Sequence, residues 1–184
     1  MYALADYIKT ERINGVEYDM SPANIQHIRI QRRLTMIIGN FLQGKKCEVF
    51  AEAEVRLSPI DHLIPDICIV CEPSQIKDTH IEGAPDFVVE VLSPSTRRKD
   101  ITVKKDTYER FGVKEYWIIN PKEECIEVYR LNEQGCYYLD NLYQNFTPEE
   151  WERLTDEQKA EQNLSLKISL YDELEIQVKD IFEM

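Results

Sequence analysis

The stretch Asp86-Phe87-Val88-Val89-Glu90-Val91-Leu92 decides the fold that we expect for this chain of 184 residues. Its many β-branched and aromatic residues are typical of a buried central strand. Strand alternation places Val88, Glu90 and Leu92 on one face and the other valines on the opposite face. A carboxylate in such a strand is costly to bury unless a cation or hydrogen bonds satisfy it. Glu90 is therefore the first candidate for a chemical role.

The residues on either side of this strand predict a mixed sheet flanked by helices. A helix is expected at about 24–42, where apolar residues recur at helical spacing, and another at about 99–111, ended by Gly112. A hairpin is expected within 11–20, with Asn14-Gly15 at its turn. Strands are expected at 47–57, 66–71, 116–119, 126–131 and 137–143. This order predicts an α/β (α+β) domain on one mixed sheet.

The length fits a single domain over residues 1–184. Its core is expected at about 11–143. Residues 148–161 look like an acidic helical appendage that lies in solvent, and 164–184 return to short strand and helix segments.

Nothing in the sequence indicates secretion or membrane insertion. No apolar run approaches the roughly 20 residues of a membrane span, and the first residues lack the features of a signal peptide. We therefore expect a cytoplasmic protein without membrane contact. Its cysteines are expected to be reduced, including those of the motif Cys68-Ile69-Val70-Cys71. The five cysteines are Cys47, Cys68, Cys71, Cys125 and Cys136.

The charge distribution gives evidence in both directions. The net charge of −12 weighs against a nucleic-acid partner, because such proteins usually carry a basic surface. Residues 97–114 nevertheless contain seven basic and three acidic residues, a local charge of +4. This segment would attract a phosphate-bearing substrate. The alternative is an ordinary solvated helix face.

Two further residues join Glu90 as candidates. Asp66 follows Pro65 and opens a strand, where a carboxylate can serve a site or simply end the strand. Lys104 shares one helical face with Ile101, Tyr108 and Phe111, and either meets Glu90 or extends to solvent. Glu90 itself either binds a metal or forms a buried salt bridge to the next helix. Two such carboxylates before a basic helix indicate a site where a hard metal ion meets a phosphate.

The order Pro65-Asp66, a strand carrying Glu90 and a basic helix resembles the PD-(D/E)XK phosphodiesterase superfamily with its restriction-endonuclease-like fold. More narrowly, the chain resembles the Uma-type restriction endonuclease family over about 11–131, and 174–182 also fits. The superfamily usually places a lysine two residues after the acid, where this chain has Leu92. The Uma-type pattern moves this lysine to the next helix, here Lys104. The motifs are Asn14-Gly15, Ser21-Pro22 with His27, Pro65-Asp66, Glu90 to Thr96, Asp100 with Lys104 and Tyr108, and Gly112 to Trp117.

The resemblance implies a metal-dependent endonuclease that acts on nucleic acid, expected to be DNA, and leaves a 5′-phosphate and a 3′-hydroxyl. Asp66 and Glu90 would hold Mg²⁺ or Mn²⁺ with the Val91 carbonyl, and Lys104 would orient a water or stabilise the transition state. A homodimer is expected by analogy. The expected substrate-binding residues are His27, Arg97, Arg98 and Tyr108.

Two other interpretations remain open at this point. The first is a protein with a nuclease fold that no longer cuts and serves as a binding or dimerisation module, which the net charge and Leu92 favour. The second is a metal-free structural protein in which Glu90 pairs with an arginine.

Overall fold

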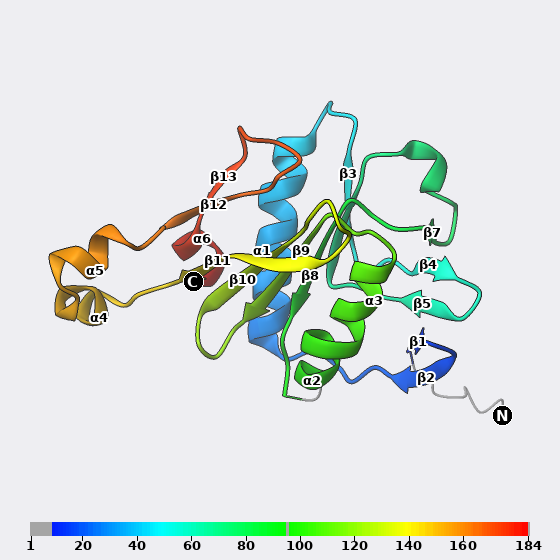
Figure 1. Cartoon of the computed structure of the whole chain (residues 1–184), viewed down its shortest axis with the longest axis horizontal. Coiled ribbons are helices and arrows are strands. Elements are labelled where there is room, and N and C mark those ends of the chain that lie inside the picture. The colour runs from blue at the N-terminus through cyan, green and yellow to red at the C-terminus, as the bar shows by residue number, and fades with distance from the viewer. Residues whose placement is uncertain (1–8, 95, 184) are drawn as a thin grey trace, which may run out of the picture.

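The computed structural model describes residues 9–94 and 96–183. Its centre is a six-stranded mixed sheet in the order β11-β10-β9-β8-β6-β3 (Figure 1). Strands β8 and β9 are parallel, and the other neighbouring pairs are antiparallel. The predicted mixed sheet flanked by helices is thereby confirmed, but the expectation of one sheet is wrong, because other strands of the described residues pair in separate sheets. The strands are β3 (Glu48–Ala51), β6 (Ile67–Val70), β8 (Phe87–Val91), β9 (Glu115–Asn120), β10 (Cys125–Leu131) and β11 (Tyr137–Gln144).

Helix α1 (Ile25–Leu42) covers one face of this sheet. Asn24 caps it by accepting a hydrogen bond from the His27 N–H, and its apolar stripe packs on the sheet. The C-terminal segments β12 (Ser165–Lys167), β13 (Glu175–Gln177) and α6 (Val178–Phe182) extend the same apolar layer. The opposite face carries α2 (Arg97–Lys99), the π-helical segment η2 (Asp100–Lys104) and α3 (Lys105–Arg110).

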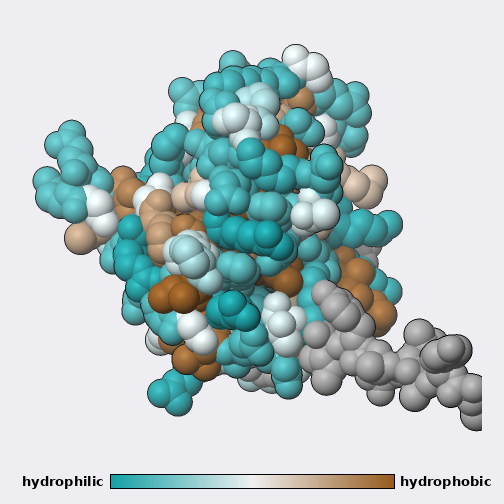
Figure 2. All heavy atoms as spheres, turned by 90° about the vertical axis from the view of Figure 1, so that its right-hand side faces the viewer, coloured by the Kyte–Doolittle hydropathy of each residue, from teal (hydrophilic) through white to brown (hydrophobic). Residues whose placement is uncertain are grey.

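A second sheet, in the order β2-β1-β5-β4-β7, lies beside these helices (Figure 1). The surface on this side is mainly hydrophilic, with hydrophobic side chains in small groups (Figure 2). The predicted hairpin is present, and Asn14 and Gly15 both have positive φ at its turn. The strands are β1 (Thr10–Ile13), β2 (Val16–Asp19), β4 (Val55–Ser58), β5 (Asp61–Leu63) and β7 (Ile81–Glu82), and η1 (Pro73–Gln75) precedes β7.

The prediction of one strand over 47–57 is wrong. Glu52 has a φ of 52° and ends β3, and the chain resumes as β4 in the other sheet. Alternation continues across this break in the sequence, so the pattern alone could not reveal it. The break matters because the Glu52 N–H donates to the backbone carbonyl of Asp66, which joins the turn to the start of β6.

The predicted helix over 99–111 is interrupted by a π-helical turn. A π turn adds a residue and rotates the residues before it around the helix axis. Asp100 is therefore buried, whereas Ile101, expected on the inner face, is 39% exposed. Lys104 and Tyr108 remain on the inner face, as predicted.

The expectation that all cysteines are reduced is wrong for two of them. Cys47 and Cys71 form a disulfide, while Cys68 is a free, buried thiol. Antiparallel pairing of β3 and β6 places Glu48 opposite Val70, so the two flanking cysteines meet across the strands.

Residues 148–161, called the arm below, form α4 (Pro148–Arg153) and α5 (Asp156–Ala160). Each helix begins with a capping box, at Thr147 and Thr155, and neither buries a residue. The arm projects from the body of the molecule (Figure 1). Across the described residues, no helix has the length and hydrophobicity that a membrane crossing needs.

Candidate functional site

A pocket of about 430 Å³ opens where the N-terminus of α1, the start of β6, the end of β8, strand β1 and η2 meet. We call it the site pocket. Carboxylates and lysines dominate its polar lining, which makes it a place for a charged ligand. They are Glu11, Glu52, Asp66, Glu90, Asp100, Lys9, Lys99 and Lys104.

Asp66 is held at the pocket by β8 and α1. Its Oδ2 accepts a 2.6 Å hydrogen bond from the Val91 N–H, and its Oδ1 lies 2.9 Å from His27 Nε2. Gln31 donates to its backbone carbonyl. Because a carboxylate only accepts, Nε2 carries the proton in this contact. These bonds fix one carboxylate directly beside the strand that carries Glu90.

Glu90 meets Lys104, as their shared position between strand and helix predicts. The Lys104 Nζ lies 2.7 Å from Glu90 Oε1, and the Tyr108 hydroxyl donates to the same oxygen at 3.2 Å. Burial raises the pKa of Glu90 well above its usual value, and Lys104 opposes this only in part. Burial also disfavours the Lys104 ammonium, yet Glu90, Glu11 and Asp100 outweigh it and raise the pKa of Lys104. Lys104 is therefore a protonated, buried cation.

Glu11 is a site residue that the sequence interpretation missed. It is 1% exposed, and its Oε1 lies 2.7 Å from Lys104 Nζ. Its Oε2 lies 2.6 Å from Lys99 Nζ. Burial opposes its charge, but the two lysines lower the pKa of Glu11 below its usual value. The sequence contains one indication that Glu11 is buried, because strand alternation puts it on the same face as Ile13, a typical core residue.

The other predicted residues divide into two groups. His27 lines the pocket, and the Val91 N–H reaches Asp66. Because a strand residue directs its N–H and C=O to the same side, the Val91 carbonyl also faces that side. Arg97 and Arg98 are exposed but do not line the pocket. Tyr108 is fully buried, so it orients Glu90 instead of forming part of the pocket wall expected for a substrate contact.

Much of the positive charge expected at 97–114 is neutralised within the protein. Lys99 and Lys104 contact Glu11, and Lys114 contacts Asp86. Arg110 contacts Asp61, and Lys105 lies over the ring of Tyr129. The predicted local field of +4 is therefore much weaker at the surface than the residue count suggests.

Glu52 and Glu54, which lie close together in the sequence, differ in their position relative to the site pocket. Glu52 lines the site pocket and pairs with Lys9 at 2.8 Å. Glu54 lies outside it and pairs with Arg56 and His62.

The donors in the pocket fit a hard cation. Asp66 and Glu90 supply carboxylate oxygens beside a backbone carbonyl, and Mg²⁺ typically binds one or two carboxylates while it keeps several waters. Within residues 9–94 and 96–183, no three His, Cys, Asp or Glu side chains are arranged to hold a metal together. Two carboxylates with a carbonyl and water thus form the available set.

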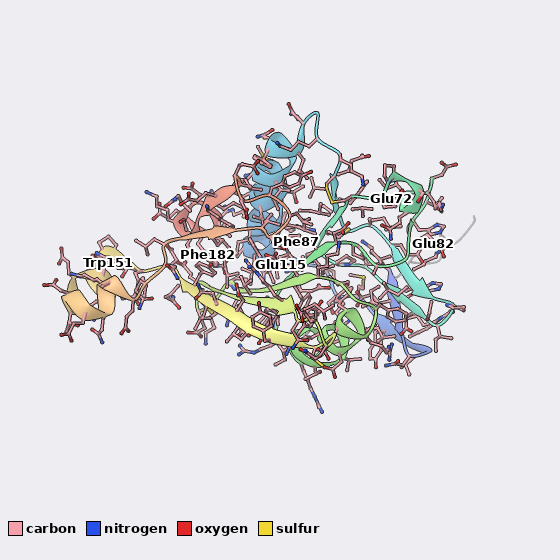
Figure 3. All side chains as sticks on the ribbon, turned by 45° about the horizontal axis from the view of Figure 1, so that its top comes forward. Glu72, Glu82, Phe87, Glu115, Trp151 and Phe182 are labelled. Carbon is pink, nitrogen blue, oxygen red and sulfur yellow. A yellow bond between two sulfur atoms is a disulfide. The ribbon has the colours of Figure 1, made fainter. Side chains whose placement is uncertain are left out.

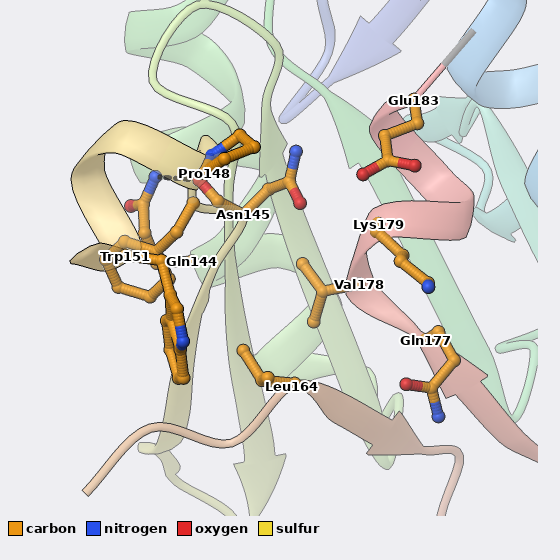
Figure 4. Close-up of a pocket in the computed structure, with 10 residues that line it drawn as sticks. Gln144, Asn145, Pro148, Trp151, Leu164, Gln177, Val178, Lys179 and Glu183 are labelled. Carbon is orange, nitrogen blue, oxygen red and sulfur yellow. Dashed lines mark hydrogen bonds between the residues drawn. The ribbon is translucent and has the colours of Figure 1, made fainter. Parts of the chain in front are cut away.

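A second pocket, of about 310 Å³, lies between the arm and α6 (Figure 4). Apolar side chains such as Trp151, Leu164 and Val178 dominate it. Lys179 and Glu183 are its charged residues, and none of the predicted site residues lines it.

The mixed sheet and the pocket of carboxylates and lysine define the restriction-endonuclease-like class of nuclease folds. The sequence model of the Uma2 family, described as "Putative restriction endonuclease", matches residues 2–169, so the chain belongs to that family.

Two proteins of known sequence or structure are similar to this chain. The protein from Synechocystis sp. named "Uncharacterized protein slr1290" is 28% identical over 137 residues, which cover 72% of each chain. A crystal structure described as a "putative nuclease belonging to DUF820" from Anabaena variabilis superposes with a TM-score of 0.71. That match has 20% identity and covers 94% of this chain and 89% of the other. This structural match supports the assignment of the fold.

Proposed function

We propose that this protein is a metal-dependent endonuclease that hydrolyses phosphodiester bonds of DNA. The observation that carries the proposal is that Asp66, Glu90 and Lys104 line one pocket. Asp66 directly precedes β6, Glu90 lies in β8 and Lys104 lies in η2, so three separate elements bring them together. Membership of the Uma2 family supports the reaction class.

Asp66, Glu90 and the Val91 carbonyl would hold Mg²⁺ or Mn²⁺. Such an ion, when bound, lowers the pKa of a coordinated water and neutralises charge on the scissile phosphate. The protein orients these ligands in advance, because Val91 N–H and His27 fix Asp66 while Tyr108 fixes Glu90. Oriented ligands reduce the reorganisation needed during the reaction.

Lys104 would stabilise the negative charge that develops on the phosphate in the transition state. Its ammonium has three donors, and Glu11 and Glu90 engage two of them at 2.7 Å. A third carboxylate, Asp100, lies farther away, with its Oδ1 3.8 Å from the Lys104 Nζ. Because the lysine is buried, its charge is screened less than a surface charge would be.

Activity should require the divalent ion. Five carboxylates line the pocket against three lysines, so the pocket repels a phosphate when no cation is bound. Arg97 and Arg98 are exposed at the start of α2, next along the chain to the pocket residue Thr96, and would contact the DNA backbone there.

Cleavage of a labelled DNA duplex, with Mg²⁺, Mn²⁺ or EDTA, tests the proposal. Asp66→Asn, Glu90→Gln and Lys104→Met should each lower kcat by roughly 10³-fold or more, since each removes charge that the transition state needs. Lys105→Met and Glu54→Gln are matched controls, because both residues lie outside the pocket. Full metal-dependent cleavage by all three site variants would exclude the assignment.

A non-cutting binding module is the second candidate, and one observation favours it. The Glu90–Lys104 ion pair is also what a purely structural role for Glu90 predicts. Calorimetry with Mn²⁺ on the intact wild type and on the intact Glu90→Gln variant distinguishes the two candidates. Saturable binding that weakens in Glu90→Gln supports the nuclease. Absent binding, or binding that Glu90→Gln leaves unchanged, supports the module.

A further inference from the structure

We propose that Glu11 is the positioning residue that holds Lys104 in place, a proposal that rests on the nuclease function above. Glu11 belongs to β1 in the second sheet, whereas Glu90 belongs to β8 of the six-stranded sheet and Asp66 directly precedes β6 of that sheet. The N-terminal hairpin thus supplies part of the site from outside the sheet that carries the carboxylate pair.

Both oxygens of Glu11 are fully engaged. Oε1 accepts a 3.0 Å hydrogen bond from the Ile64 N–H and lies 2.7 Å from Lys104 Nζ. Oε2 lies 2.6 Å from Lys99 Nζ, and Lys99 in turn lies 5.3 Å from the ring centre of Tyr18. A buried carboxylate with partners on both oxygens has little freedom to move, so it can fix the groups that it contacts.

Lys104 needs such an anchor because its side chain begins on a helical segment and not on a strand of the site. Its backbone lies in the π-helical turn η2, and its four-carbon side chain must reach a site built on strands. Strand β8 offers no lysine of its own, since Leu92 occupies the usual position. A flexible lysine that comes from a helix is held in one place only if it is paired on more than one side.

Glu11 and Glu90 pair with Lys104 in different ways. The Lys104 Nζ lies 2.7 Å from one oxygen of each. Glu90 is a proposed metal ligand and shares its charge with any bound cation, whereas Glu11 is not and keeps its full charge for the lysines. Asp100 lies farther from the Lys104 Nζ, at 3.8 Å. Of the two carboxylates at 2.7 Å, Glu11 is therefore the partner that retains Lys104 when the cation is present.

The experiment replaces Glu11 with its neutral isostere and follows Lys104 in two ways. Glu11→Gln keeps the side-chain shape and the acceptor for Ile64 N–H but loses the charge. Duplex cleavage with Mn²⁺ should show kcat reduced about 10- to 100-fold, the range that misplacement of a reacting group produces. KM and the Kd for Mn²⁺ should stay within about twofold. Glu17→Gln, on the same hairpin but paired with the exposed Arg12, should match the wild type.

A spectroscopic measurement does not depend on cleavage. The ammonium ¹⁵N–¹H signal of Lys104, assigned by its loss in Lys104→Met, should be visible in the wild type because burial slows proton exchange. It should weaken or vanish in Glu11→Gln and persist in Glu17→Gln. If Glu11→Gln does not fold, Glu11→Asp keeps the charge but withdraws it by one methylene, and the same losses of kcat and signal are expected.

The outcomes separate the two proposals. Wild-type protein that fails to cleave any duplex overturns the proposed function, and the Lys104 signal then decides the role of Glu11 alone. Cleaving wild-type protein whose Glu11→Gln variant keeps kcat within twofold and retains the Lys104 signal overturns the role of Glu11. Loss of Mn²⁺ affinity or a raised KM at unchanged kcat also overturns it, because Glu11 would then bind metal or substrate directly.

Discussion

The two faces of the six-stranded sheet are built from the same strands but differ in chemistry. On the α1 side, alternate residues of β8 such as Phe87 and Val89 join a large apolar cluster. On the α3 side, Val88 and Leu92 are also apolar, but Glu90 between them joins the charged network of the site pocket. The predicted alternation of β8 is thus confirmed, and it separates a wholly apolar set of β8 residues from a set that includes the charged Glu90.

Each face of the sheet carries a buried glutamate, and the surroundings of these two residues show how the faces differ. Glu115 in β9, which is labelled in Figure 3, is fully buried. It accepts hydrogen bonds from Trp117 Nε1 at 2.6 Å and from the Ser169 N–H at 2.8 Å. Its hydrogen-bond donors are neutral, and it does not line the site pocket. Glu90 instead has a cation and a pocket beside it. Burial is therefore common to both glutamates, and the paired cation and the open pocket are what distinguish Glu90 from Glu115.

The largest effect on stability is expected from the apolar face. Trp117 is fully buried and packs edge-on against Phe87 with ring centres 4.9 Å apart. Trp117→Ala should lower the free energy of unfolding by about 3–5 kcal/mol, because it leaves a cavity and removes a donor from Glu115. Urea unfolding measures this loss. Activity per folded molecule should stay near the wild-type value, and a selective loss of kcat would contradict the division between the faces.

Loss of the disulfide should have the next largest effect. Cys47 belongs to the apolar cluster, and its bond to Cys71 joins two cysteines that are 24 positions apart in the sequence. The double variant Cys47→Ser/Cys71→Ser should lower the free energy of unfolding by about 2–4 kcal/mol, chiefly by freeing the unfolded chain. Unfolding curves of oxidised wild type and the variant measure it. Equal midpoints would show that the bond contributes nothing in solution.

The two glutamate environments should respond in opposite ways to conservative changes. Glu115→Gln removes one acceptor from a buried pair of donors and should lower stability by about 1–3 kcal/mol without changing kcat. Tyr108→Phe removes the hydroxyl that orients Glu90 and should lower kcat several-fold, with a stability loss of about 1 kcal/mol. Unfolding and cleavage measured on both variants form the test. The comparison fails if Glu115→Gln is the more damaging to kcat.

The sequence predicted the regular parts of the fold well because they follow hydrophobic periodicity. Strand β8, helix α1 and the hairpin at Asn14-Gly15 are present as expected. The errors lie where the pattern continues but the backbone does not. Alternation runs through Glu52 although the strand ends there, and helical spacing runs through 100–104 although the turn is π-helical. Local sequence carries little information on either change.

Prediction of the site residues depended on how far apart in the chain the partners lie. Lys104 and Glu90 are close in sequence, so helical periodicity was enough to place Lys104 on the face toward Glu90. Glu11 lies in another sheet and reaches Lys104 from a distant part of the chain, a contact that no periodicity reports. The disulfide was missed because it depends on the register of β3 against β6. Hydrophobic periodicity therefore does not predict which residues from distant parts of the chain contact one another.

The smallest effect concerns Cys68, a buried thiol on the α3 side of the sheet. Burial, with a contribution from the negative charge of Glu90, raises the pKa of Cys68 from 9.0 to about 12. Between these values the unfolded chain has released the proton that the folded chain still holds. The unfolded state therefore binds fewer protons in this window, and stability falls as the pH rises from about 9 to about 12.

Comparison with Cys68→Ala isolates this contribution, because tyrosines and other groups titrate alike in both proteins. The stability advantage of the wild type over Cys68→Ala should shrink by about 1.4 kcal/mol between pH 7 and pH 10, since one pKa unit lies between 9 and 10. Urea unfolding at both pH values measures the difference. Iodoacetamide at pH 8 should modify the exposed Cys136 in the folded protein and leave Cys68 intact until the chain unfolds. A constant advantage at both pH values, or rapid modification of Cys68, would show that this side of the sheet is open to water well beyond the site pocket.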